Sequence, residues 1–457
     1  MPAASLVAQD RRPPGPPLRR GLGDQLRYYA AFATDPAGFV AKRFQQYGDI
    51  YYAPATDGGL YVLKHPDHLR DLLITHAGSY RKTHTALRRL TRFLGDGLLT
   101  SDGADWTRQR RMVQPAFARN HLAGFAAIMV EESDRTLAQW QAGELRDLGR
   151  DVMALTLRSV SRCLFGQDSA GEVNAVASAM MTFQAEFASV DFLPPWMPTP
   201  QRIRFRRALA TIDRIVFGMI DAQRKAGPAT DGPDNLLALL ASAIDSEGDG
   251  SGLTREEVRD QLVTLFLAGH DTTSYALLWT MTLLAGHPEA TKLLTSELDA
   301  VLGPRAPTLE DLPRLVYTEQ VIKEAMRMYP PAFAVGRRAA ADTEIGGYAV
   351  PAGSEVIAWI YMTHRDPRWF PEPEAFRPER FAPGAEAALP RLAYLPFGAG
   401  PRACIGRQFA MIEAQLMLAR IYQKFTLELT PGHKIAAKFR ITLMPKHGLR
   451  ARLHARA

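Results

Sequence analysis

The chain has 457 residues, a net charge of +7, 46% hydrophobic residues and 23% charged residues, which is ordinary for a soluble globular protein. Its two cysteines, Cys163 and Cys404, exclude a disulfide framework and suit a reducing cytoplasm, where we expect the protein to act. The sequence has no apolar run of about 18 residues that predicts a membrane span, no secretory signal at residues 1–10 and no recognisable nucleic-acid module.

The sequence of the N-terminal part predicts a proline- and arginine-rich segment followed by a β-hairpin. Residues 1–34 are rich in proline and arginine, and we expect a single domain over residues 35–457. Strand-forming residues at 50–53 and 60–63 flank a turn at residues 56–59, which is typical of a β-hairpin.

The rest of the chain is mostly helical until strands return near its end. Helical patterns run from about residue 105 to 330, and strand signals return at residues 343–345, 348–350 and 354–360. Strands at both ends can pair only if the helices fold between them. We therefore predict one mostly α-helical domain with smaller β-sheets, an α+β fold.

A proton-handling site is predicted in the middle of a long apolar helix over residues 254–285. Thr254 and Glu257 have the spacing of a capping box that starts this helix. The helix is apolar nearly all round, which predicts that it is buried. Gly269, Asp271 and Thr272 interrupt this apolar pattern at its centre. Residues that break the pattern of their own element often have a function. Asp271 and Thr272 form an acid–alcohol pair suited to relaying protons. The competing interpretation is a buried polar cluster whose hydrogen bonds are all satisfied.

A haem-ligand loop is predicted around Cys404. Glycines and an arginine precede this cysteine, and an apolar helical face at Phe409, Ile412, Leu416 and Ala419 follows it. A helix beginning at the cysteine would lower the thiol pKa and favour a thiolate. Cysteine thiolate is the axial ligand that favours O–O cleavage on haem iron. The competing interpretation is a buried, inert cysteine, which we assign to Cys163.

These motifs resemble the cytochrome P-450 family. Residues 397–406 fill its pattern Phe-x-x-Gly-x-Arg-x-Cys-x-Gly, and residues 268–272 fill the pattern of its oxygen-activating helix. Glu-x-x-Arg at residues 324–327 and Trp-x-x-x-Arg at residues 106–110 also match, in the family's order, within a resemblance from about residue 35 to 450. The resemblance implies the P-450 fold, with haem between a long distal helix and the helix of the cysteine loop.

The resemblance also implies a role for each matching residue. It makes Cys404 the iron ligand, Asp271 and Thr272 the catalytic pair, and Trp106, Arg110, Arg337 (with Arg338 one position away) and Arg402 the propionate ligands. It adds Phe397, Gly400 and Gly406 to the haem-binding set, and it joins Glu324, Arg327 and Arg380 in a structural network.

The implied activity is that of a haem-thiolate monooxygenase, which inserts one oxygen atom of O2 into an apolar molecule by hydroxylation or epoxidation. Haem b is the implied cofactor. NAD(P)H supplies electrons through a separate acidic ferredoxin or flavodoxin and its reductase, because the chain shows no flavin or iron–sulfur segment. We expect a monomer with a basic docking face, for which the candidates are Arg108, Arg111, Arg407, Lys434 and Lys438.

Three alternatives remain open at this point: oxidative coupling or rearrangement without oxygen insertion, peroxide-driven oxidation, and a non-catalytic haem sensor. The substrate is not fixed by the sequence. The resemblance places Leu99, Ala268, Ala332 and Val335 in the substrate pocket, and Phe183, Phe187 and Phe192 either form its roof or pack in a helical core. Their apolar character fits a fatty acid, a terpenoid or a steroid-like molecule.

Overall fold

The computed structural model describes residues 11–17, 21–54, 59–83, 90–91, 93–166, 175–176, 178–179, 182, 197, 199–227 and 235–456. The chain divides into two compact units. Unit 1 comprises Met1–Thr85 and Glu324–Cys404, and unit 2 comprises Ala86–Lys323 and Ile405–Ala457. The prediction of a single domain over residues 35–457 stays a prediction.

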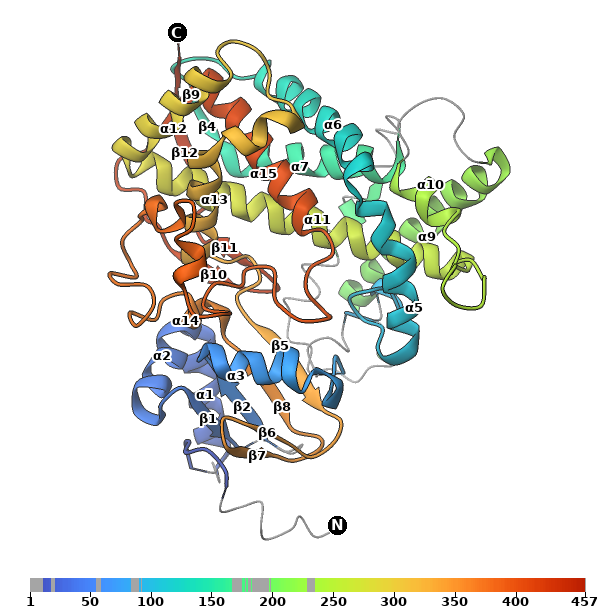
Figure 1. Cartoon of the computed structure of the whole chain (residues 1–457), viewed down its shortest axis with the longest axis vertical. Coiled ribbons are helices and arrows are strands. Elements are labelled where there is room, and N and C mark those ends of the chain that lie inside the picture. Colours follow the sequence, from blue (N-terminus) through green and yellow to red (C-terminus); the bar gives the residue numbers. More distant parts are fainter. Residues whose placement is uncertain are drawn as a thin grey trace. The chain divides into compact units, whose positions relative to one another are not determined.

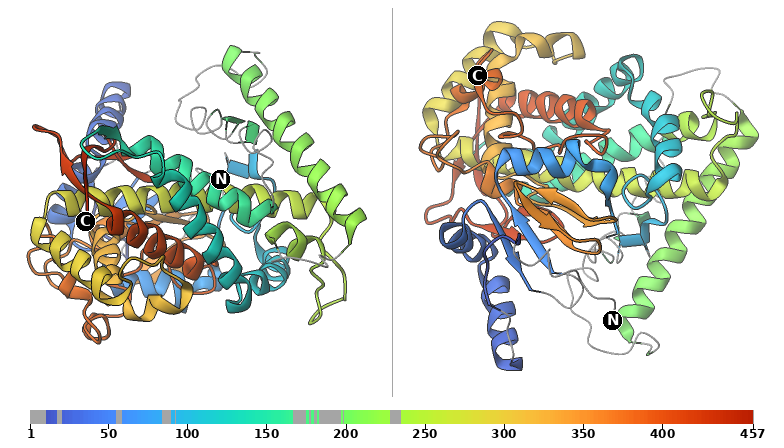
Figure 2. Two further views of the ribbon diagram at one scale, coloured as in Figure 1. Left: turned by 90° about the horizontal axis from the view of Figure 1, so that it is seen from above. Right: turned by 60° about the horizontal axis from the view of Figure 1, so that its bottom comes forward.

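Unit 1 is built on a five-stranded sheet of order β1-β2-β8-β5-β3, whose blue and orange strands lie side by side in Figure 2. Its helices are short, and one small hairpin, β6-β7, stands apart from the main sheet. The elements are α1 (Leu22–Thr34), α2 (Pro36–Tyr47), β1 (Ile50–Ala53), β2 (Leu60–Leu63), α3 (Pro66–Arg70), β3 (Tyr80–Arg81), β5 (Val335–Ala339), β6 (Thr343–Ile345), β7 (Tyr348–Val350), β8 (Glu355–Ala358) and α14 (Ile360–Thr363).

The predicted hairpin forms with the predicted bounds. Strands β1 and β2 pair antiparallel, and β2 pairs parallel with β8, so that Val62 lies opposite Ile357. Tyr61 and Leu63 are fully buried on β2. Segments from both ends of the chain therefore share one sheet, as predicted, whereas residues 56–58 of the predicted turn lie outside the described residues.

Unit 2 contains the long helices, which are labelled in Figure 1. It also holds a three-stranded sheet of order β4-β12-β9 and the hairpin β10-β11. The elements are α5 (Gly103–Val113), α6 (Arg119–Leu137), β4 (Leu145–Asp147), α7 (Leu148–Phe165), α9 (Pro200–Ala226), α10 (Leu236–Ala241), α11 (Arg255–Ala285), α12 (Pro288–Val301), α15 (Arg407–Lys424), β9 (Phe425–Leu429), β10 (Ala437–Phe439), β11 (Leu443–Pro445) and β12 (Arg450–Ala455).

Helix α13 (Val316–Met328) begins in unit 2 and ends in unit 1. Short helical turns complete the described chain at Asp71–Thr75, Ala77–Ser79, Gln114–Phe117, Leu309–Arg314, Pro378–Phe381 and Glu386–Ala388.

Helix α11 is the buried centre of unit 2. It starts at the predicted capping box, in which the Thr254 hydroxyl accepts from Glu257 N and the Glu257 carboxylate accepts from Thr254 N. It ends at Ala285, as predicted. Helices α7, α9, α10, α12 and α15 all pack against it, and Figure 1 shows α7 and α15 along its length. This packing buries it nearly all round, as its apolar sequence predicts.

The fold is therefore mostly α-helical with small sheets, as the sequence predicts. In the part of the chain that the structure describes, no helix combines the length and the apolar character needed to cross a membrane.

Candidate functional site

The residues predicted for the site fall into two groups, one in each unit, and each group is described within its own unit. Unit 1 carries Cys404, Phe397, Gly400, Arg402, Arg337, Ala332, Val335, Glu324, Arg327 and Arg380, and unit 2 carries Asp271, Thr272, Ala268, Leu99, Trp106, Arg110 and Gly406.

The loop before Cys404 is held by its own backbone. Cys404 N donates to Phe397 O at 2.9 Å, which closes the loop on itself. Gly400 has φ +70°, and a Cβ there would stand 1.8 Å from the backbone oxygen of Leu73. A glycine is therefore required at this position both by its conformation and by the close approach of the neighbouring chain. The Cys404 residue itself is exposed.

Two details of the cysteine loop differ from the prediction. Helix α15 begins at Arg407, three residues after Cys404, so the cysteine lies in the loop and not at the helix start. Gly406 caps this helix with φ −87°, and a Cβ there would meet its nearest neighbour, Phe117, only at 3.9 Å. The backbone therefore does not require a glycine at 406, and its role in haem binding stays a prediction.

A histidine that the sequence analysis missed supports the approach to this loop. His364 is fully buried, and its Nε2 accepts a hydrogen bond from Leu395 N at 2.9 Å. Burial, with Arg327 and Arg365 nearby, lowers the pKa of His364 to about 3, so the ring stays neutral and can accept. His364 belongs to no sequence motif, so only its burial and its contacts in the structure show its role.

The predicted network around Glu324 is present in unit 1. Glu324 and Arg327 are fully buried, and Arg327 donates to both carboxylate oxygens, at 2.7 and 2.9 Å. A third donor of Arg327 reaches His364 O at 2.9 Å, and Arg380 Nε lies 3.4 Å from Glu324 Oε1. The bidentate pair lies within α13, and its further bonds, from Arg327 to His364 O and from Arg377 N to Glu324, join the helix to the segment that leads to the cysteine loop.

We predict that Arg327→Ala will lose about 3–5 kcal/mol of unfolding free energy, because it leaves the Glu324 carboxylate buried without its main partner. Urea unfolding and haem content measure this. Lys323→Ala, on the same helix, removes an ion pair with the partly exposed Glu319 and should cost less than about 1 kcal/mol. A stable, haem-replete Arg327→Ala protein would contradict the structural role of this pair.

The predicted propionate ligands are distributed over both units, and each is described within its own unit. Trp106 and Arg110 lie four residues apart on α5, on one face of the helix. Arg337 is 8% exposed on β5 and donates to Gly336 O. Arg338, the alternative, projects from the opposite face of the strand because side chains alternate along it. Their contacts with a propionate remain predictions.

In unit 2, the acid–alcohol pair lies in the middle of α11. The Thr272 hydroxyl donates to Ala268 O at 2.6 Å, one turn back, as the hydroxyls of Ser274, Thr280 and Thr282 do along the same helix. Asp271 is 4% exposed. The Cβ position of Gly269 faces Val160 of α7 at 3.5 Å, an ordinary van der Waals distance, so the packing of the two helices does not require a glycine here.

Of the predicted pocket residues, Leu99 and Ala268 belong to unit 2. The loop around Leu99 is fixed to α11, since Leu98 N donates to Gln261 Oε1 at 3.0 Å and Asp96 N donates to the Asp260 carboxylate at 2.7 Å. Ala332 and Val335 belong to unit 1. The predicted roof of Phe183, Phe187 and Phe192 lies outside the described residues.

A second buried carboxyl group, Glu413, lies on α15 and was missed by the sequence analysis. It is fully buried and accepts a hydrogen bond from Ser159 Oγ of α7 at 2.7 Å. Burial raises its pKa to about 7, although the Ser159 and Thr273 hydroxyls oppose this shift. A carboxyl group is unexpected inside an almost wholly buried helix, and this is the observation that identified Asp271 from the sequence. The same observation could have identified Glu413.

The raised pKa of Glu413 predicts that the unfolding free energy of the protein depends on pH. Its pKa is about 7 in the fold against an ordinary 4.5, so folded protein holds a proton that the unfolded chain releases between these values. Stability should therefore fall as pH rises from 4.5 to 7, by roughly 3 kcal/mol in all. Glu413→Gln should remove this loss, so its unfolding free energy should exceed that of the wild type more at pH 8 than at pH 6. Glu374→Gln, at an exposed glutamate, is the control. If the difference in unfolding free energy between Glu413→Gln and the wild type is the same at pH 6 and at pH 8, the buried Glu413 does not hold a proton in the fold.

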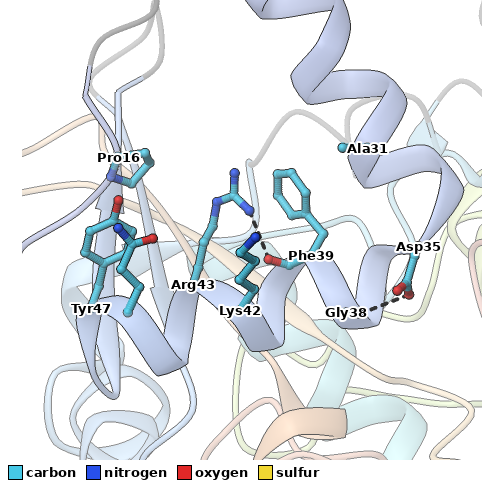
Figure 3. A pocket seen from close by; sticks show the side chains of 9 residues that line it. Pro16, Ala31, Asp35, Gly38, Phe39, Lys42, Arg43 and Tyr47 are labelled. Carbon is cyan, nitrogen blue, oxygen red and sulfur yellow. Dashed lines mark hydrogen bonds between the residues drawn. The ribbon is translucent and has the colours of Figure 1, made fainter.

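A cavity of about 440 Å³ lies between α1 and α2 in unit 1. Asp35, Phe39, Lys42, Arg43 and Tyr47 line it, as Figure 3 shows. Arg43 Nη1 donates to Phe39 O at 2.9 Å, and its guanidinium stacks over the Phe39 ring. None of the predicted site residues lines this cavity.

The residues of the cysteine loop fit a haem. The exposed cysteine stands at the end of an internally bonded loop, and Arg402 lies two residues before it. A thiolate suits the iron, and a guanidinium suits a propionate.

Comparisons with known proteins agree with this fit. The sequence matches the family described as "Cytochrome P450" over residues 13–450. "Cyclooctatin synthase" of Streptomyces melanosporofaciens is 36% identical over 416 residues, or 90% of each chain. "Cyclooctat-9-en-7-ol 5-monooxygenase" of the same organism is 34% identical over 93% of each chain. "Pentalenene oxygenase" of Streptomyces avermitilis is 33% identical over 90% of this chain and 91% of its own.

A solved structure has the same fold. The "cytochrome P450DA heme domain" superposes with a TM-score of 0.88 at 27% identity and covers 98% of both chains.

Proposed function

Because the chain belongs to the cytochrome P450 family and is a haem-dependent monooxygenase, we propose that it oxidises a carbocyclic terpenoid. Electrons from NAD(P)H reach it through a separate ferredoxin or flavodoxin and its reductase. The proposal includes the cytoplasmic location expected from the sequence.

One observation carries the choice of substrate class. Relatives that match about nine-tenths of the chain are named for the oxidation of cyclooctat-9-en-7-ol and of pentalenene. The small or apolar side chains at Leu99, Ala268, Ala332 and Val335 support a substrate of this kind. This narrows the earlier range, which also included fatty acids and steroid-like molecules.

Each of the predicted site residues has its own proposed role. Haem supplies the activation of O2 when it is bound. Cys404 provides the thiolate for the iron, and Trp106, Arg110, Arg337 and Arg402 hold the propionates by charge and hydrogen bonds. Asp271 and Thr272 hold and move protons on α11.

The electron donor is proposed to be acidic because the chain carries a net charge of +7. Two of the predicted docking cations are engaged inside unit 2, since Arg108 pairs with Glu257 and Arg111 pairs with the buried Asp245. The proposed docking face includes Arg407, Lys434 and Lys438, which are exposed.

Binding spectra of the purified holoenzyme test the substrate class. Pentalenene and cyclooctat-9-en-7-ol should shift the haem absorption at micromolar concentration, and turnover with ferredoxin and reductase should yield a product heavier by one oxygen atom. Palmitate and testosterone serve as fatty-acid and steroid probes. A shift and product with either of these, and none with the two carbocycles, would reject the terpenoid assignment.

We predict that Thr272→Ala will uncouple turnover. The hydroxyl that donates to Ala268 O is lost, so protons arrive without control and reducing equivalents end in hydrogen peroxide. NAD(P)H oxidation should continue, while product per NAD(P)H falls several-fold and peroxide rises. Thr272→Ser keeps the hydroxyl and should restore coupling. Equal coupling in Thr272→Ala and wild type would reduce Thr272 to a packing residue.

A further inference from the structure

Two buried glutamines join α5 to α11 through their side-chain amides. Gln261 of α11 is fully buried, and Gln109 of α5 is 2% exposed. Gln261 Nε2 donates to Gln109 Oε1 at 3.0 Å. Position 109 is an unspecified position of the Trp-x-x-x-Arg pattern, and Gln261 belongs to no motif. The sequence alone therefore assigns neither glutamine a role.

The other ends of the two amides bind the loop of residues 95–101, which we call the Leu99 loop. Gln261 Oε1 accepts from Leu98 N at 3.0 Å, and Gln109 Nε2 donates to Asp96 O at 3.0 Å. Each amide oxygen thus accepts and each amide nitrogen donates, which fixes the orientation of both side-chain amides. The result is one chain of hydrogen bonds that leaves the loop at Leu98 and returns to it at Asp96.

Two further contacts bring the Leu99 loop close to the same two helices. Ser101 Oγ donates to Gln109 Oε1 at 3.0 Å, so the last residue of the loop is also bound to α5. A Cβ at Gly97 would stand 2.7 Å from the backbone oxygen of Asp260 on α11. That distance is too short for a side chain, so glycine is needed for the loop to approach the helix this closely.

The position of Leu99 depends on these bonds, because it lies between two residues that the amides hold. Loss of the Gln261 amide would leave Leu98 N–H buried without its acceptor. Loss of the Gln109 amide would leave Gln261 Nε2 buried without its acceptor. Buried groups that lose their partners are costly, so the loop would move to find new ones. Both amides are neutral, and salt does not screen their bonds as it screens an exposed ion pair.

We propose that Gln109 and Gln261 are positioning residues that fix Leu99 and thereby set the selectivity of the substrate pocket. This rests on the proposed function, in which Leu99 lines that pocket and α5 carries the propionate ligands Trp106 and Arg110. Gln109 directly precedes Arg110 on α5, so the helix proposed to bind the haem also holds the Leu99 loop. The loop is thereby kept in register with the haem.

Hydrogen exchange of the holoenzyme tests the amide chain without a substrate. The peptide of residues 95–101 should exchange slowly, since Leu98 N–H is bonded to a buried side chain. Gln261→Met keeps the length of the side chain but removes the amide, and exchange of this peptide should rise about tenfold. Gln415→Met, at a buried glutamine of α15, is the matched control and should leave the peptide unchanged. Equal exchange in Gln261→Met and the wild type would overturn the proposal.

Direct ligands of the haem iron test selectivity without relying on the terpenoid assignment. The probes are imidazole and the larger phenylimidazole, whose binding depends on steric access to the iron. Leu99→Ala and Gln261→Met should each lower the ratio of the phenylimidazole to the imidazole dissociation constant several-fold, because each removes or releases the pocket wall. Gln415→Met should keep the wild-type ratio even where it lowers the unfolding free energy equally. A wild-type ratio in Gln261→Met would overturn the proposal.

Ser101→Ala removes a single bond to the loop, so it keeps the test available if a glutamine variant does not fold. It should lower the same ratio, by less than Gln261→Met, and a wild-type ratio would count against the proposal.

A double-mutant cycle shows whether Gln261 acts through Leu99. In the Leu99→Ala background, Gln261→Met should change the ratio by less than about twofold, because the side chain that it positions is already absent. Independent, multiplicative effects would overturn the proposal. An unchanged ratio in Leu99→Ala alone would instead reject the proposed place of Leu99 in the pocket, and the exchange of residues 95–101 would still decide whether the amides hold the loop.

Discussion

The buried ion pair between Glu324 and Arg327 is the interaction on which unit 1 depends. Both side chains are fully buried, and the guanidinium reaches two carboxylate oxygens and two backbone oxygens, of His364 and Ala375. Burying two charges adds little net stability, but breaking the pair leaves one of them uncompensated. The pair therefore specifies one path for the chain. His364, held through its carbonyl by Arg327, presents Nε2 to Leu395 on the way to the cysteine loop.

In unit 2, hydroxyl groups are the hydrogen-bond partners of buried polar side chains. A helix as buried as α11 gains nothing from polar side chains unless each finds a partner. Ser274 meets Thr156 of α7, and the Glu413 carboxyl group of α15 meets Ser159 of α7. These contacts join three helices around the position of Asp271 and Thr272. Ser274 and one oxygen of the Glu413 carboxyl group thus have hydrogen-bond partners inside the core of unit 2.

The sequence predicts the elements well where the pattern is local. The hairpin strands, the capping box at Thr254 and the end of α11 at Ala285 all follow from residues close together in the chain. It misses residues whose partners are distant in the chain. No local spacing encodes the bond from Leu395 N to His364 or the bond from Ser159 to Glu413. Nor does it show that Leu73 is the neighbour whose backbone approaches Gly400.

The central claim is that Cys404 supplies the axial thiolate, and the absorption spectrum of the ferrous–CO complex tests it most directly. The wild type should show the band of a thiolate-ligated haem, and Cys404→Ser should lose it. Cys163→Ser, at a buried cysteine of α7, should keep the band. A wild-type spectrum typical of histidine ligation, or a thiolate band that survives in Cys404→Ser, would contradict the account.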